Sequence, residues 1–432
     1  MANIILFVGI LVFLAHFFAA VFKKFKIPDV LPLMLLGVLV GPVMGWILPE
    51  DFGKAGDIFT TIVLIVVLFE SGLVLNMKVL KTTMASALRL TLNSFALIFL
   101  VIGIVSALTS ELTLLEGLVL ASILGGISSV IVAPIVERLD FGKGMQARLV
   151  VESTVSDALC IIFVLGLLNL YSSRTFNLSL WGSEIIGDLI GSIFVGFISG
   201  ILWAFVLRQV RQIENSIFAT PAFVFIVFGA VETIGWSGAL AALAFGVSLG
   251  NIHGFHLTET FHLLKKSKPL SLNHTEKNFL EEAVFLLKTF FFMYIGLSIN
   301  LDNNYILFGA GLLVVLMLIL RIFSILISWR GESITAIEAS LAAVMIPKGL
   351  AAAALASLPL AYGLPAGEII QSLVFAVILF SVMATAFLVF LLERGWLTEP
   401  YQTVFRGFAP VSPLNIEELH SGARGGNRTH TP

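Results

Sequence analysis

Four charged side chains lie deep within long apolar segments of the sequence: Glu70, Glu152, Asp157 and Arg321. A charge held at the centre of a lipid bilayer costs at least about 2.5–3.5 kcal/mol, so charged residues in such segments mark pairing partners or ion pathways. A carboxyl group that loses its water prefers to keep its proton, whereas a bound monovalent cation favours the ionised form. A buried carboxylate of this kind can therefore exchange a proton for a cation.

Two of these carboxylates belong to one predicted helix, which spans about residues 149–170. Glu152 and Asp157 are five residues apart, about 140° around an α-helix, so they point in different directions. Ser153 and Asp157 are four residues apart and share a face. An always-charged guanidinium is tolerated in lipid only when it is paired or hydrated, which makes Arg321 the expected partner of Glu152. Asp157, beside Ser153, would then be the group that titrates.

Glu70 is a third acidic group in an apolar segment, and Lys348 is a second deeply placed base. We expect Glu70 to lie near Asp157 and to contribute to the same ion site. In the alternative interpretation, all three acids pair with Arg321 and Lys348 and only hold the helices together.

Two apolar segments carry residues that interrupt a helix. One contains Gly125-Gly126-Ile127-Ser128-Ser129, and the other contains Pro347-Lys348-Gly349. Interrupted helices at corresponding places in two halves of a transporter line a polar cavity with free carbonyls and half-helix ends. We therefore expect two inverted repeats whose broken helices cross, with Ser128 and Ser129 at the crossing and Lys348 neutralising its dipoles. Each break alone is also explained as a packing kink.

The amino-acid composition indicates whether these segments belong to a soluble protein or to a membrane protein. Of the 432 residues, 58% are hydrophobic and 12% are charged, compared with about 45–50% and about 25% in a soluble domain. This balance excludes a soluble enzyme, a nucleic-acid-binding protein and a disordered chain, and indicates an all-α polytopic membrane protein. The single cysteine, Cys160, excludes a disulfide framework and a cysteine-ligated metal site. We expect no metal site, cofactor, nucleotide or nucleic-acid partner.

A spanning helix needs about 20 apolar residues. Thirteen such segments are predicted, at about 3–22, 30–48, 58–76, 90–109, 116–136, 149–170, 185–207, 216–234, 237–251, 280–299, 305–328, 334–360 and 368–392. The fourth to sixth and the eleventh to thirteenth segments would form the two inverted repeats.

The basic residues predict the orientation of these segments. If the N-terminus lies outside, the inner loops hold most of the lysines and arginines, and the outer loops hold only Lys54 and Arg174. Basic loops stay in the cytoplasm, so the C-terminus is expected there. Residues 1–395 would form the transmembrane domain, and residues 396–432 a short, disordered cytoplasmic tail.

At these residues the chain resembles the monovalent cation:proton antiporter superfamily, and within it the Na⁺/H⁺ exchanger family. The resemblance covers nearly all the predicted spans and rests on six motifs in order: Ile27-Pro28 with Gly37 and Gly41-Pro42; Phe69-Glu70-Ser71-Gly72-Leu73; Glu152-Ser153 with Asp157; Phe290-Phe291-Phe292 with Ile295-Gly296-Leu297; Arg321; and Pro347-Lys348-Gly349-Leu350-Ala351. It implies that Glu70, Ser153 and Asp157 help to bind the ion and that Glu152 pairs with Arg321. It also implies a core bundle that moves against a dimerisation scaffold, in a homodimer of the cell membrane.

Two positions depart from the family pattern. The residue before the binding aspartate is Asn or Asp in the main branches of the family but is Ser156 here, and the usual Thr-Asp-Pro of the fifth span is replaced by Ser128-Ser129-Val130. The second replacement is more similar to the potassium-efflux branch. The identity of the cation therefore does not carry over from the resemblance, while the lone aspartate implies one proton per cation.

The sequence thus predicts a secondary antiporter that exchanges Na⁺, K⁺ or Li⁺ for H⁺, with Asp157 alternately protonated and cation-bound. Ser153, Glu70, Ser156, Ser128 and Ser129 are the other candidate residues of the cation and proton site. Such a protein needs no enzyme chemistry. Two alternatives remain open: a Na⁺-coupled symporter of an organic anion, favoured by the basic Lys348, and a non-transporting sensor or scaffold derived from the same fold.

Overall fold

The computed structural model describes residues 9–18, 20, 30–47, 49, 54–74, 77–138, 143–173, 178–213, 216–252, 272–332 and 334–408. The regular elements in these residues are all helical, which confirms the predicted class. Seven segments are long and apolar enough to cross a membrane: Met84–Thr109, Leu114–Val132, Gly144–Ser172, Ile190–Leu207, Ser216–Thr233, Asn304–Trp329 and Gly367–Glu393. Five shorter apolar helices occupy Gly9–Phe18, Val30–Val43, Ile58–Leu73, Gly238–Gly250 and Leu350–Ala361.

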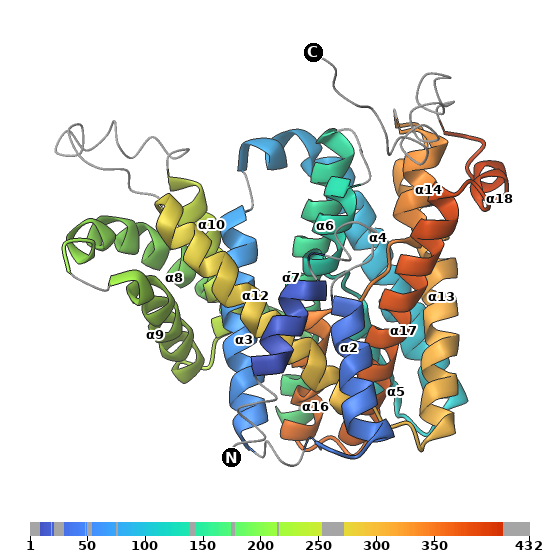
Figure 1. The fold of residues 1–432 in the computed structure, drawn as a ribbon, viewed down its shortest axis with the longest axis horizontal. Helices are drawn as coiled ribbons and strands as arrows, with labels where there is room; N and C mark the ends of the chain where they lie inside the picture. Colours follow the sequence, from blue (N-terminus) through green and yellow to red (C-terminus); the bar gives the residue numbers. More distant parts are fainter. Residues whose placement is uncertain are drawn as a thin grey trace.

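One group of helices lies to the left in Figure 1. It consists of α8 (Leu178–Val210), α9 (Ala219–Thr233) and α10 (Gly238–Gly250). α3 (Lys54–Val74) packs on α10, and α12 (His274–Leu297) crosses in front of α3. α2 (Val30–Val38), which continues into the π-helix η1 (Leu39–Val43), packs on α12.

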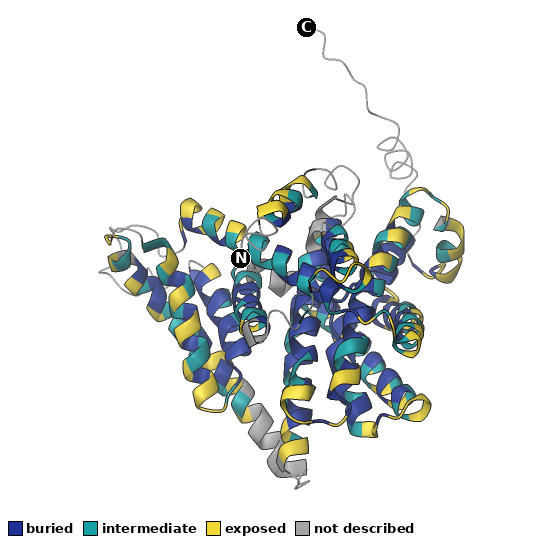
Figure 2. Ribbon diagram, turned by 60° about the horizontal axis from the view of Figure 1, so that its bottom comes forward, coloured by how far each residue is buried: buried dark blue, intermediate teal, exposed yellow. Residues whose placement is uncertain are grey.

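A second group lies to the right in Figure 1 and contains the broken helices. Its long members are α4 (Met77–Thr109), α7 (Lys143–Ser173), α13 (Asn304–Trp329) and α17 (Gly367–Glu393). The shorter members are α5 (Leu114–Leu124), α6 (Ser129–Arg138), α14 (Ala336–Val344), α15 (Leu350–Ala356) and α16 (Leu358–Ala361). Figure 2 shows buried residues where these helices meet and exposed residues on their outer faces.

Glycine pairs let α3 approach α10 closely and let α2 approach α12 closely. A Cβ added at Gly72 would meet the backbone of Gly246 on α10 at 3.0 Å, and one added at Gly37 would meet Gly296 on α12 at 2.9 Å. Helices in lipid associate through such close van der Waals contacts rather than through the hydrophobic effect. The glycines therefore fix α3 on α10 and α2 on α12.

Both broken helices begin with the same capping arrangement. The Thr113 hydroxyl accepts the Glu116 N–H at the start of α5, while the Glu116 carboxylate accepts the Thr113 N–H. Thr335 and Glu338 repeat this arrangement at the start of α14. A capping box satisfies the free amide groups of a first turn, which explains why both helices begin at these residues.

Both predicted interruptions are present. α5 ends at Leu124 and α6 begins at Ser129, with non-helical residues 125–128 between them. α14 ends at Val344 and α15 begins at Leu350, with non-helical residues 345–349 between them. Glycine disfavours and proline prevents a continuous helix, so the breaks lie where the sequence predicts them.

The prediction of a disordered tail from residue 396 is wrong for its first part. α18 (Thr398–Val404) is helical, Phe405 is fully buried, and Phe408 is 7% exposed. α18 packs on α14, and the Phe405 ring packs edge-on against Phe408 at 5.4 Å. The two aromatic side chains bury enough apolar surface to order the segment. Residues 409–432 lie outside the described residues.

We expect Phe405→Ala to destabilise the protein, because truncating a buried phenylalanine costs about 3–5 kcal/mol. Thermal unfolding of the detergent-solubilised protein, followed by intrinsic tryptophan fluorescence, measures the change. Val404→Ala is the control, since Val404 lies on α18 and is 46% exposed. An equal loss in both variants would show that Phe405 does not anchor the segment.

Candidate functional site

The two non-helical segments touch each other inside the second group of helices. The Ser128 N–H donates to the Pro347 carbonyl at 2.8 Å, and the Lys348 Nζ donates to the Gly126 carbonyl at 2.6 Å. Lys348 is 1% exposed, so its ammonium compensates carbonyl groups that the broken helices leave without helical partners. The breaks therefore form one polar crossing within apolar helices.

Asp157 faces this crossing from α7. Its Oδ2 lies 3.5 Å from the Ser129 hydroxyl, and a Cβ added at Gly126 would lie 3.3 Å from its Oδ1. The Asp157 side chain is half-buried. A carboxylate and a hydroxyl side by side provide oxygen ligands suited to a dehydrated monovalent cation, and the carboxylate also binds a proton.

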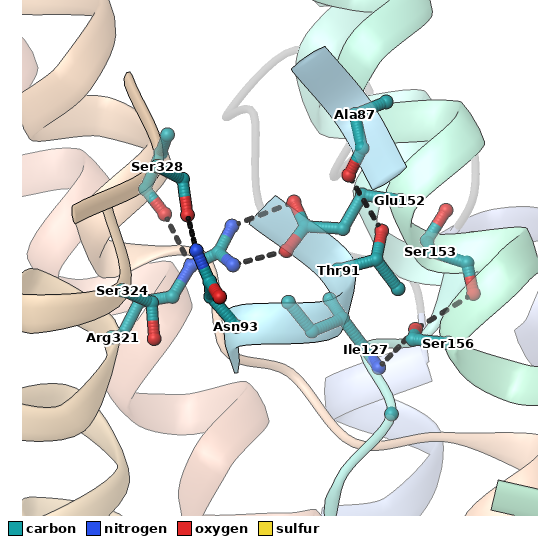
Figure 3. Close-up of polar contacts among 12 residues, drawn as sticks. Ala87, Thr91, Asn93, Ile127, Glu152, Ser153, Ser156, Arg321, Ser324 and Ser328 are labelled. Atoms are coloured by element: carbon teal, nitrogen blue, oxygen red, sulfur yellow. Dashed lines mark hydrogen bonds and ion pairs between the residues drawn. The ribbon is translucent and has the colours of Figure 1, made fainter. Parts of the chain in front are cut away.

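The other serines predicted for the site lie at different places around the crossing. The Ser156 hydroxyl accepts the Ile127 N–H at 3.0 Å and donates to the Ser153 carbonyl at 2.9 Å, so it attaches the broken segment to α7 (Figure 3). The Ser153 hydroxyl donates to the Val150 carbonyl. The Ser128 hydroxyl is buried and has no hydrogen-bond partner within the described residues.

Glu152 of α7 and Arg321 of α13 form a bidentate ion pair (Figure 3). The Arg321 Nη2 donates to the Glu152 Oε2 at 2.8 Å, and its Nη1 donates to Oε1. The Arg321 Nε donates to the Ala342 carbonyl at 3.1 Å. Both charged side chains are 1–2% exposed, so the pair joins α7, α13 and α14 in a dry environment.

Within the described residues, no hydrogen bond joins Glu70 to Asp157. The Glu70 Oε2 instead accepts the Lys288 Nζ of α12 at 3.3 Å, and each side chain is 23% exposed. The sequence gives no signal for this partner, because Lys288 lies 218 residues away on another helix.

Two residues of α17 support the crossing and were not predicted. The Ser381 hydroxyl accepts the Lys348 N–H at 3.0 Å, and the Thr385 hydroxyl accepts the Ile346 N–H at 3.4 Å. Both are fully buried and lie one helical turn apart. Hydroxyl residues at this spacing in an otherwise apolar helix are the signal that could have identified them, because free amide groups of a broken helix need acceptors.

The crossing is packed so closely that position 349 requires glycine. A Cβ at Gly349 would overlap the Oγ and Cβ of Ser128. We expect Gly349→Ala to separate the broken segments and to lower both the yield of folded protein and its melting temperature. Ser128→Gly in the same chain removes the overlapping atoms and should recover part of the loss.

Gly229→Ala is the matched control for this substitution. Gly229 lies in α9, and a Cβ added there meets nothing within 4 Å. Size-exclusion profiles and melting temperatures in detergent compare the variants. A harmless Gly349→Ala, or no recovery from Ser128→Gly, would contradict the close contact.

Comparison with known proteins places this geometry in context. The family model described as "Sodium/hydrogen exchanger, transmembrane" matches residues 10–394. Na(+)/H(+) antiporter 1 of Methanocaldococcus jannaschii is 24% identical over 371 residues, which cover 81% of this chain and 82% of that protein. K(+)/H(+) antiporter NhaP2 of Shewanella sp. is 23% identical over 384 residues. The alignment covers 84% of this chain but only 61% of NhaP2, so this chain spans less than two thirds of the length of that relative.

The fold is also similar to that of a solved structure. The sodium proton antiporter MjNhaP1 from Methanocaldococcus jannaschii at pH 8 superposes with a TM-score of 0.67 and 20% identity, over 88% of this chain and 98% of that one. At this identity the match supports the helical fold alone.

Proposed function

Because the chain belongs to the sodium/hydrogen exchanger transmembrane family, we propose that it is a secondary antiporter exchanging a monovalent cation, Na⁺, K⁺ or Li⁺, for H⁺. The relatives named above are Na⁺/H⁺ and K⁺/H⁺ antiporters. The observation that carries the proposal is the position of Asp157, which faces the crossing next to the Ser129 hydroxyl. The identity of the cation is left to experiment.

Exchange follows from the competition of two ligands for one carboxylate. When Asp157 is protonated it cannot serve as an anionic ligand, and a cation bound to ionised Asp157 displaces the proton. The Ser129 hydroxyl lies beside Asp157, and Ser156 holds the broken segment in place. We expect the Ser128 and Ser153 hydroxyls to be further ligands. Because the two ligands exclude each other, moving one across the membrane drives the other in the opposite direction.

The inverted repeats of this proposal are supported by a constant spacing. Gly126 and Lys348, whose carbonyl and ammonium meet at the crossing, are 222 residues apart. The capping threonines, Thr113 and Thr335, have the same separation. Two halves that share the capping box, the broken helix and the spacing are expected when a fold is built from an internal repeat.

The proposal includes the finer architecture predicted from the sequence. Thirteen spans, an outer N-terminus and a cytoplasmic C-terminus would place residues 1–395 in the membrane as one domain. α12 is not among the seven long apolar helices and carries several charged residues, but it corresponds to the predicted span 280–299. Two groups of helices divide the molecule (Figure 1), which suits a core bundle moving against a scaffold in a homodimer of the plasma membrane.

Reconstitution into liposomes tests the function. Vesicles that enclose a pH-sensitive dye are given Na⁺, K⁺ or Li⁺ separately, and we expect at least one cation to move protons in the opposite direction. Uptake of an organic anion driven by Na⁺, without cation-driven pH change, would favour the symporter. Absence of any cation-dependent pH change would contradict antiport.

A further inference from the structure

Lys288 places an ammonium group beside Glu70, an acidic residue of α3. The Lys288 Nζ lies 3.3 Å from the Glu70 Oε2. Within the part of the chain that the structure describes, neither group has another polar partner. Each of the two side chains is 23% exposed, so the pair is partly hydrated.

The other intramembrane ion pair has opposite properties. Glu152 and Arg321 are joined by two hydrogen bonds and are 1–2% exposed. A planar guanidinium binds both carboxylate oxygens at once, whereas an ammonium is a compact, strongly hydrated point charge on a flexible chain. The Lys288 Nζ and the Glu70 Oε2 are 3.3 Å apart. This distance is longer than the N–O distance of a strong charge-assisted hydrogen bond, which is about 2.7–2.9 Å. The Glu152–Arg321 pair is therefore permanent, and the Glu70–Lys288 pair is exchangeable.

The helix that carries Glu70 packs on a helix that begins at the crossing. α15 begins directly after Lys348 and Gly349, and it packs against both α3 and α7. Phe69, next to Glu70, packs on Phe245 of α10, and Gly72 packs on the α10 backbone, so α3 is fixed on α10. Glu70 consequently has a rigid backbone and a partner that can leave.

We propose that Lys288 sets the affinity for the transported cation, because its ammonium competes with that cation for Glu70. An ammonium group has the charge of a monovalent alkali cation and is similar in size to K⁺. The Lys288 ammonium binds the Glu70 carboxylate while no cation is present and moves away from it when a cation binds. This inference rests on the proposed antiport, and it assigns to Lys288 the role of setting how much cation is needed.

Lys288→Met tests the competition, because methionine keeps the length of the side chain and removes its charge. The apparent KM for the transported cation should fall about two- to fivefold, the range expected when a partly exposed ion pair no longer has to be broken. Lys288→Arg should keep a high KM. Lys277→Met is the control, since Lys277 is exposed on the same helix and should leave the KM unchanged.

Glu70→Gln separates competition from a structural role. In Glu70→Gln chains, adding Lys288→Met should no longer lower the KM, since the shared carboxylate is absent. A purely structural pair predicts instead a lower melting temperature with an unchanged KM, which would overturn the inference. An unchanged or higher KM in Lys288→Met would do the same.

A binding measurement keeps the outcome independent of transport. A cation that binds the folded protein raises its melting temperature in a concentration-dependent way. The concentration giving half-maximal stabilisation should also fall about two- to fivefold in Lys288→Met. A wild-type protein that neither transports nor is stabilised by Na⁺, K⁺ or Li⁺ overturns the proposed function and this inference together. Normal wild-type behaviour with an unshifted Lys288→Met overturns this inference alone.

Discussion

Asp157→Asn is expected to abolish cation-driven proton movement while leaving the protein folded in the membrane. Asparagine keeps the shape of the side chain and a carbonyl oxygen near Ser129, but it can neither carry a proton at neutral pH nor neutralise a bound cation. Both halves of the exchange are lost together because both use the same group. Dye-reported pH changes in proteoliposomes should fall to the level of empty vesicles.

Asp302→Asn provides the same chemical change at an exposed position outside the crossing. Its exchange rate should match that of the wild-type protein. A size-exclusion profile like that of the wild type would show that Asp157→Asn remains folded. Transport that survives in the folded Asp157→Asn protein would remove the central step of the proposed mechanism.

Some parts of the site could be predicted because the chemistry of single residues restricts their possible partners or conformations. Arg321 cannot lose its charge and must find an acid within the membrane, and Glu152 is its partner in the structure. The breaks near Gly126 and Lys348 follow from residues that cannot continue a helix. Local chemistry determines these features, so a single sequence reveals them.

Other parts depend on how distant helices pack. Glu70 was expected beside Asp157, yet its partner is Lys288, because α12 crosses α3 at that level. The order of the segment around Phe405 likewise depends on the surface that α14 offers to α18. Neither contact leaves a periodic signal, since each joins residues far apart in the chain.

The dry ion pair between Arg321 and Glu152 carries the second large expected effect. Arg321→Met leaves the Glu152 carboxylate buried without its partner, and removing one member of a buried pair costs about 3–5 kcal/mol. The substitution also frees the Ala342 carbonyl, which accepts the Arg321 Nε. We expect a large fall in melting temperature and a poor yield of monodisperse protein, even though Asp157 and the crossing keep their own residues.

Arg89→Met is the matched control, because Arg89 also pairs with a glutamate, Glu332, but at 3.6 Å and with 53% of its side chain exposed. An exposed pair contributes about 0–1 kcal/mol, so this variant should unfold close to the wild-type temperature.

Glu152→Gln combined with Arg321→Met distinguishes an unpaired charge from lost packing. Glutamine has nearly the volume of glutamate and carries no charge, so the double variant should be more stable than Arg321→Met alone. A double variant as unstable as the single one would mean that Arg321 acts mainly through its contact with α14. Recovery would show that the cost of Arg321→Met is that of an uncompensated carboxylate, and that the pair holds α7 to α13 by mutual neutralisation.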